Sequence, residues 1–369
     1  MGRSPEHVLN AGTPWVGRLR ELAREFADVR RTIKRRLGIL APLRIAMYGG
    51  YGTTQDLTLR GRVLEERERA APSLQDSPLS NFRRAFWQFE SDEVPRVELE
   101  LDLGGGERAI VVTDEDGYFM LRHRFATPAA PGWRMVRARV TRAPYPVSVL
   151  PSAEGQVLIP SPSARFGVIS DIDDTILQSF VQNRPRMVYL TLVGNPFTRQ
   201  PFEGTTELYR GLRECGQGAP FFYVSKSMWN LFPLLERFIA HQHLPRGALL
   251  LRNMRLFGPR PSVPHKADAI RELLETYATL PFLLIGDSGE HDLDLYLDAA
   301  RRYPGRVRAI LIRNVSPAEK RAALERAAEG EVPAGCRVLL FDDTRAAIEL
   351  CTELGCWQST PLVTLPPPA

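Results

Sequence analysis

Cysteine, lysine and long apolar runs are all scarce in this sequence. Only four of its 369 residues are cysteine, none in a CxxC pair, and a chain of this length needs no disulfides to bury a core. We therefore expect reduced thiols and a cytoplasmic location. No uncharged apolar run reaches the roughly 18 residues that span a membrane, and no apolar signal-peptide core is found. These absences exclude a disulfide-stabilised secreted scaffold and a bundle of membrane-spanning helices.

Most of the chain also has no excess of charge of either sign. The 48 basic and 43 acidic residues leave a net charge of +5. Residues 1–38 contain nine of the basic and four of the acidic residues, so that segment carries the whole surplus. The remaining chain is neutral, and we expect no binding to nucleic acid.

Residues 14–37 predict one amphipathic helix, because their apolar side chains recur every three or four positions. Thr13 can cap its start and Gly38 can end it. Two interpretations stay open. In one, the helix makes peripheral contact with an anionic membrane through its apolar face. In the other, it packs on the core of its own protein and keeps its arginines in solvent.

The next hundred residues change character, to short strands separated by turns. Residues 97–103 alternate strictly between apolar and polar, and three glycines follow them. Residues 110–113 and 118–123 predict a hairpin across the turn 114–117. This spacing indicates a small antiparallel β-sandwich, Ig-like or transthyretin-like. The expected division is a basic helix over 1–40, the sandwich over 41–150, a Pro/Ser-rich linker over 151–163 and an α/β domain over 164–360.

From Ser163 onward, apolar runs alternate with helical patterns. Such alternation predicts α/β architecture, a parallel sheet with helices on both faces. In such sheets ligands bind beyond the carboxyl ends of the strands. The expected strands are 166–170, 221–225, 248–251, 282–285, 307–312 and 338–341, and the expected helices are 205–215, 229–241, 266–277 and 317–328.

Polar side chains gather after these strands. Asp171 and Asp173 follow the first strand, Ser225 ends the second, Lys266 opens a helix, and Asp287 follows the fourth strand. Carboxylates at one edge of a sheet repel one another unless a cation neutralises them. Oxygen ligands on a rigid frame suit Mg²⁺, which is commonly completed by a phosphate oxygen.

These residue types can perform phosphoryl transfer. One carboxylate can attack phosphorus and form an aspartyl-phosphate, while Asp173 acts as general acid and then activates water. Ser225 and Lys266 offer a hydroxyl and a positive charge to the phosphoryl oxygens.

The sequence motifs in these segments resemble those of the haloacid-dehalogenase-like phosphatases. DxDxT stands at Asp171, Asp173 and Thr175, Ser225 and Lys266 fall on the second and third motifs, and GDSGxxD contains Asp287 and Asp292. A closer resemblance is to the APP1-type, Mg²⁺-dependent phosphatidate phosphatases. It rests on VISDIDDTI (168–176), FFYVSKSMWNL (221–231), LLLRNM (249–254), HKADAI (265–270), LIGDSGEHDLDLY (284–296), VRAILIRNV (307–315) and LLFDD (339–343). Lys226 and Met228 depart from the family pattern.

The resemblance implies a role for each residue. Asp171 would be nucleophile and Mg²⁺ ligand, Asp173 acid/base with its backbone carbonyl on the metal, and Thr175 would steady the loop. Asp287 would be a further ligand, with Asp292 supporting the metal site. It also implies a Rossmann-like sheet and a phosphorylated lipid substrate that yields diacylglycerol and phosphate. The stretches available for a cap, 44 and 38 residues long, are too short for a large one, so we expect an open site.

Other functions remain open at this point. The same chemistry could serve another phosphomonoester: a nucleotide, a nucleic-acid end or a phosphoprotein. A non-catalytic lipid-binding adaptor and a serine esterase built on Ser288 are further alternatives. The stretch Asp342-Asp343-Thr344 is interpreted as a helix cap, and His291 as a hydrogen-bonding neighbour of the site.

Overall fold

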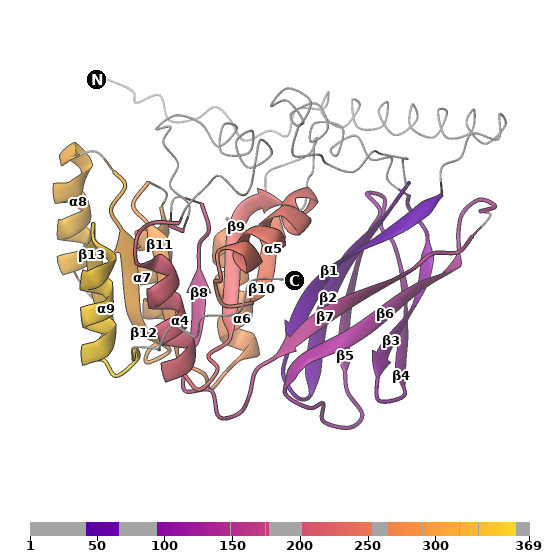
Figure 1. Cartoon of the computed structure of the whole chain (residues 1–369), viewed down its shortest axis with the longest axis horizontal. Coiled ribbons are helices and arrows are strands. Elements are labelled where there is room, and N and C mark those ends of the chain that lie inside the picture. The colour runs from indigo at the N-terminus through magenta and orange to yellow at the C-terminus, as the bar shows by residue number, and fades with distance from the viewer. Residues whose placement is uncertain are drawn as a thin grey trace, which may run out of the picture.

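The computed structural model describes residues 42–65, 94–147, 149–173, 175–176, 201–252, 265–289, 291–316, 318–330 and 332–358. The predicted basic helix lies outside these ranges. The described chain forms two β-sheets, and the helices gather around the second (Figure 1). Within the described ranges, no helix is long and apolar enough to cross a membrane.

The first sheet has seven strands in the order β4-β3-β6-β7-β1-β2-β5. Every neighbouring pair is antiparallel except β1 and β7, which run parallel. The strands are β1 (Leu43–Gly52), β2 (Asp56–Glu65), β3 (Glu98–Gly104), β4 (Glu107–Val112), β5 (Tyr118–Arg124), β6 (Gly132–Arg142) and β7 (Ser152–Ile159). The alternation expected for 97–103 is confirmed: Leu99, Leu101 and Leu103 are fully buried, with partly exposed residues between them.

The predicted sandwich is confirmed only as a mostly antiparallel sheet. Its strands form one sheet that curls until its two edges approach each other. Glu107 on β4 and His123 on β5 join these edges, with Oε2 and Nε2 2.6 Å apart. The sheet is therefore barrel-like and nearly closed.

The predicted hairpin is wrong in its pairing, although both strands and their turn exist. The amide of Gly117 donates to the carbonyl of Asp114 across the turn. However, β4 pairs with β3, and β5 pairs with β2. The glycine turn after β3 brings β4 back onto β3, so β5 completes the opposite edge.

The structure also differs from the predicted linker at 151–163. Residues 152–159 are β7, which pairs with β6 and β1. Proline and serine flank this strand, so the composition of the whole segment resembles that of a linker. The division of the chain into independent domains stays a prediction.

The second sheet has six parallel strands in the order β10-β9-β8-β11-β12-β13. All the predicted strands and helices of this half are confirmed to within a few residues. The strands are β8 (Gly167–Ser170), β9 (Phe221–Met228), β10 (Ala248–Arg252), β11 (Phe282–Asp287), β12 (Val307–Arg313) and β13 (Arg337–Phe341). The helices are α4 (Thr205–Cys215), the 3₁₀ turn η1 (Trp229–Leu231), α5 (Phe232–His241), α6 (His265–Thr276), α7 (Asp292–Arg302), α8 (Ala318–Glu329) and α9 (Thr344–Glu353).

Helices cover both faces of this sheet, as predicted. Successive residues of a strand point to opposite faces, so Val168 enters the core shared with α4, α5 and α9, whereas Ile169 enters the core shared with α6, α7 and α8. The predicted cap is also found: Asp343 precedes α9, and its Oδ1 accepts from the amide of Arg345.

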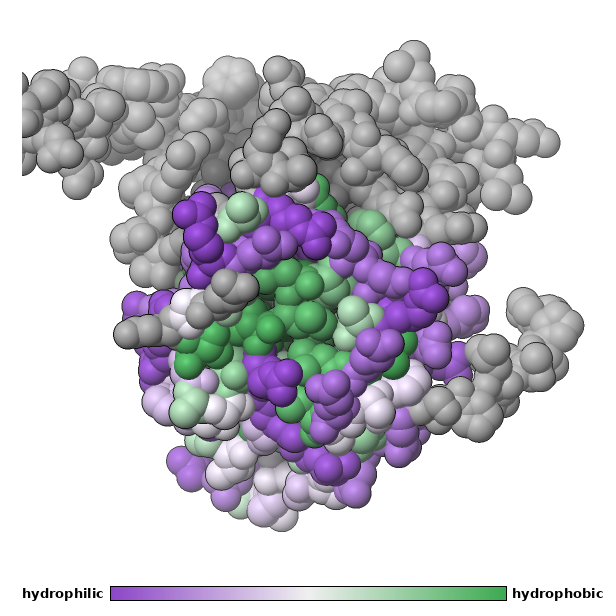
Figure 2. All heavy atoms as spheres, turned by 90° about the vertical axis from the view of Figure 1, so that its left-hand side faces the viewer, coloured by the Kyte–Doolittle hydropathy of each residue, from purple (hydrophilic) through white to green (hydrophobic). Residues whose placement is uncertain are grey.

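The far edge of the second sheet is less well covered. Figure 2 faces the end of the molecule that holds β13, where apolar side chains gather and hydrophilic ones surround them. β13 is the edge strand, and its Val338, Leu339 and Leu340 are only partly buried.

Candidate active site

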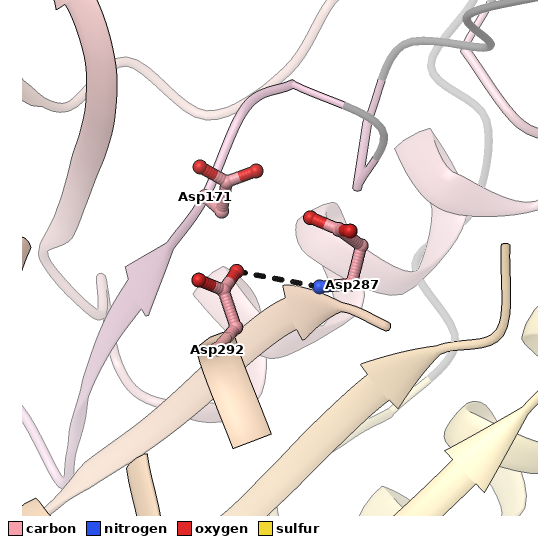
Figure 3. A group of neighbouring side chains, drawn as sticks. All are labelled: Asp171, Asp287 and Asp292. Carbon is pink, nitrogen blue, oxygen red and sulfur yellow. Dashed lines mark hydrogen bonds between the residues drawn. The ribbon is translucent and has the colours of Figure 1, made fainter. Parts of the chain in front are cut away.

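The three central strands place the polar residues. β8 lies between β9 and β11, so the residues at their carboxyl ends meet at one edge. Asp171 follows β8 directly, Ser225 lies in the last half of β9, and Asp287 ends β11. Figure 3 shows the carboxylates of Asp171, Asp287 and Asp292 converging there.

Asp171 lies at the centre of this group and is 1% exposed. The Nζ atom of Lys266 is 2.7 Å from its Oδ1. The hydroxyl of Thr175 lies 3.2 Å from its Oδ2 and 3.4 Å from Oδ2 of Asp287, bridging the two carboxylates. These contacts are compatible with the expected role of Thr175 in steadying the loop, which stays a prediction.

Asp292 holds its neighbours in place. Its Oδ1 accepts from Nζ of Lys266 at 2.8 Å, and its Oδ2 faces the amide of Asp287 at 3.4 Å. Gly286 makes this approach possible, because a Cβ there would lie 2.6 Å from the Asp292 carboxylate. The carboxylate of Asp287 is oriented in turn by the amide of Gly289, 2.7 Å from its Oδ1.

The charge balance in this group favours an added cation. Burial raises the pKa of Asp171 well above its usual range. The charge of Lys266 opposes this rise, whereas those of Asp292, Asp287 and Asp173 add to it. One lysine cannot neutralise these buried carboxylates. One oxygen each from Asp171, Asp287 and Asp292 lies within 4.8 Å of the others. An oxygen-only set of this kind fits a hard divalent cation.

Asp173 lies apart from that triad, on the side of β9. Its Oδ2 accepts from the hydroxyl of Ser225 at 2.8 Å and from that of Ser227 at 3.3 Å. The amide of Ser227 donates to Oγ of Ser225. The structure therefore brings every predicted site residue to one edge, in two groups: a carboxylate–lysine group and a serine–carboxylate group.

Ser227 and Arg313 also lie at this edge, although neither was predicted as a site residue. Arg313 ends β12, is 3% exposed, and donates from Nε to the carbonyl of Thr175. Its Nη2 donates to the hydroxyls of Thr205 and Thr344. Burial lowers its pKa to about 10. A polar residue at the end of an apolar strand was the signal that found Asp287, and it applies equally to Arg313.

Ser288 and His291 make contacts that do not suggest a catalytic role. The Oγ atom of Ser288 accepts from the amides of Val315 and Ser316, which is a poor arrangement for a nucleophile and weakens the esterase alternative. His291 is exposed and lies 3.8 Å from the carboxylate of Asp294.

An open site was expected, but Asp171, Ser225 and Lys266 are all buried. The described part of the site is therefore more enclosed than expected. The two stretches in which a cap would be inserted include residues 177–200 and 253–264, outside the described ranges. The absence of a large cap stays a prediction.

Comparison with known proteins adds independent information. Residues 166–314 match the family described as phosphatidate phosphatase APP1, catalytic domain. The chain is 32% identical over 152 residues to phosphatidate phosphatase APP1 of Saccharomyces cerevisiae, covering 40% of this chain and 26% of that protein. It is 31% identical over 154 residues to an uncharacterized protein of Schizosaccharomyces pombe, covering 41% of this chain and 25% of that protein. The match thus spans about a quarter of each relative.

Among solved structures, the PKD domain of the human receptor SorCS2 aligns with 34% of this chain and 80% of its own, at 19% identity and a TM-score of 0.20. That score is too low to carry an argument about the fold. The family match covers the part of the chain that contains all of the predicted site residues. Residues 166–314 of this chain are thus similar to the catalytic domain of the APP1-type phosphatidate phosphatases.

Proposed function

We propose that this protein is a Mg²⁺-dependent phosphatidate phosphatase with a haloacid-dehalogenase-like, Rossmann-type catalytic sheet. The observation that carries the proposal is the buried group around Asp171, where Lys266 contacts Asp171 and Asp292 and the carboxylate of Asp287 lies close by. The family match over residues 166–314 supports the reaction class. The phosphatidate substrate comes from the name of the yeast relative.

The donor set fits Mg²⁺. Asp171 and Asp287 would hold the ion with their carboxylates and Asp173 with its backbone carbonyl, while Asp292 keeps Lys266 and Asp287 in place. When bound, Mg²⁺ would neutralise the charge that builds up on the phosphoryl oxygens.

The chain's own residues would then perform two displacements. The carboxylate of Asp171 attacks phosphorus, and the bond between phosphorus and the lipid oxygen breaks. Asp173 donates a proton to that oxygen, releasing diacylglycerol. Asp173 next takes a proton from water, whose oxygen attacks phosphorus and frees Asp171 and phosphate. Lys266 would offset negative charge beside the nucleophile.

Ser225 would contact a phosphoryl oxygen, and its position supports this. Its hydroxyl is fixed by Asp173, the residue that must reach the leaving oxygen. A substrate phosphate would compete with that carboxylate for the serine hydroxyl. Binding would thereby release Asp173 toward the leaving group.

A substrate panel tests the proposal. Purified full-length protein is given phosphatidate vesicles, a nucleotide monophosphate and a phosphopeptide, each with Mg²⁺ and with excess chelator. We expect Mg²⁺-dependent phosphate release that is fastest from phosphatidate. Faster release from another substrate would keep the chemistry and replace the lipid. No release from any substrate would favour a lipid-binding adaptor.

Membrane contact forms a separate part of the proposal. Residues 1–38 carry the entire +5 charge and would bring a cytoplasmic protein to an anionic surface. Removing them should weaken sedimentation with anionic vesicles and leave hydrolysis of a soluble phosphomonoester unchanged. Unchanged sedimentation would return the helix to its other interpretation, packing on the protein's own core.

A further inference from the structure

The first sheet touches the catalytic sheet just beyond the serine–carboxylate group. The turn η1 begins two residues after Ser227, so its position limits where the end of β9 can lie. Residues of β1 and β2 pack directly on this turn. The first sheet therefore contacts the segment that directly follows the end of β9.

An aromatic stack forms one part of this contact. The ring of Tyr48 on β1 lies on that of Trp229, with centroids 4.8 Å apart and planes 20° apart. Phe232 completes the group, 5.5 Å from Tyr48. Tyr48 and Trp229 are 5% and 3% exposed, so this is a sealed contact between the sheets. Packed aromatic pairs of this kind are worth about 0.5–1.5 kcal/mol beyond their buried area.

A buried arginine forms the other part. Arg62 on β2 is fully buried. Its Nε donates to the carbonyl of Asp116, its Nη1 donates to Oδ1 of Asn230 in η1, and its guanidinium lies 4.3 Å from the ring centre of Tyr118. A guanidinium is costly to bury unless its donors are used, so these contacts fix its position. Arg62 thereby ties η1 to the first sheet.

The same sheet also contacts the helix that carries Lys266. Glu272 on α6 accepts from Arg60 and Arg122, each at 3.3 Å. These pairs are partly exposed and contribute less than the buried contact. Together the two contacts join the first sheet to both elements that present Ser225 and Lys266.

We propose that the first sheet is a positioning part of the catalytic centre, and that Arg62 and Tyr48 are positioning residues for Ser225 and Ser227. The inference rests on the proposed phosphatase function, but it concerns a part of the chain outside the family match. It assigns the sheet a role in catalysis in place of a role as a separate binding domain.

Steady-state kinetics on a soluble phosphomonoester test this with Arg62→Met and Asn230→Ala. The second variant leaves Arg62 bonded to Asp116 and stacked on Tyr118, so the first sheet keeps its own contacts. Displacing a substrate-contacting group by about 1 Å costs up to about 100-fold. We expect kcat/KM to fall about 10- to 100-fold in Arg62→Met, with a higher KM and a higher Ki for orthophosphate. The Mg²⁺ concentration giving half-maximal rate should not change.

A matched control is Arg139→Met, on the same sheet, where the arginine is 63% exposed and lies 3.3 Å from Glu100. This variant should keep the wild-type KM, Ki and kcat. A fall in kcat alone in Arg62→Met and Asn230→Ala would show only fewer folded molecules and would overturn the proposal, as would unchanged kinetics.

Hydrogen exchange separates this inference from the proposed reaction. In both test variants, amides 225–231 should exchange at least several-fold faster, while those of β11 keep their wild-type rates. Unchanged exchange at 225–231 would refute the positioning role even if the wild type is an active phosphatase. Faster exchange without any wild-type phosphatase activity would support the mechanical link and refute the reaction.

Discussion

Replacing Lys266 by methionine should destabilise the protein, because it leaves the buried carboxylates of Asp171 and Asp292 without their ion-pair partner. The ammonium lies 2.7 Å from Asp171 and 2.8 Å from Asp292, and all three side chains are at most 1% exposed. Methionine fills similar volume but removes the ammonium group that opposes the raised pKa of Asp171. The two carboxylates must then become protonated, draw in water or bind a metal.

The expected cost is large. Removing one partner of a buried ion pair destabilises proteins by about 3–5 kcal/mol, because it leaves the other charge uncompensated. A typical domain has an unfolding free energy of about 5–15 kcal/mol, so Lys266→Met should lose about a fifth of it or more. Adding Asp292→Asn should recover part of the loss, since it removes one uncompensated charge.

Urea unfolding at pH 7, with and without Mg²⁺, measures these effects. Mg²⁺ should stabilise Lys266→Met more than the wild type, because it replaces the missing positive charge. The control is Lys226→Met, at an exposed lysine, where the change should stay within about 0.5 kcal/mol. The reasoning fails if Lys266→Met matches the wild type, or if neither Mg²⁺ nor Asp292→Asn recovers stability.

Three further predictions follow from individual contacts. Arg313→Lys keeps the charge but loses the fork that holds the Thr175 carbonyl, so kcat/KM should fall about tenfold and stability by about 1–3 kcal/mol; wild-type kinetics would contradict this. Ser288→Ala should retain phosphatase activity within a few-fold, and a complete loss would revive a nucleophilic role for that serine. Burial raises the pKa of Asp171, so the contribution of this group to the stability of the metal-free protein is fully present below the unfolded value of about 3.9 and is lost as pH rises through the folded pKa. Mg²⁺ requires the ionised carboxylate, so thermal melts should show a larger Mg²⁺-induced rise in Tm at pH 8 than at pH 5, and a larger rise at pH 5 would contradict this.

The second sheet was predictable because both of its faces are buried. Strands such as β8 and β11 are continuous apolar runs, and each carries a carboxylate at its end. The strand-end rule therefore locates Asp171 and Asp287 from the sequence alone.

The first sheet was predictable only strand by strand. Local turn signals located 104–106 and 114–117, but pairing depends on contacts between distant segments. β1 is rich in glycine and β7 includes Glu154, Gly155 and Gln156, so neither shows the alternation that reveals β3.

Within the site, the sequence predicted which residues meet but not how they divide. Nothing in the spacing shows that Asp173 bonds Ser225 and Ser227 while Lys266 bridges Asp171 and Asp292. These contacts depend on the relative height of strand ends and helix starts, which the side-chain pattern does not encode.

The most direct test of the central claim is phosphate release from phosphatidate vesicles with Mg²⁺, comparing the wild type with Asp171→Asn. Asparagine is nearly isosteric but cannot serve as the nucleophile, so the rate should fall by more than about 1,000-fold, while the variant stays folded. Asp343→Asn, which alters an exposed helix cap, should keep the wild-type rate. Equal rates for the wild type and Asp171→Asn would contradict the account.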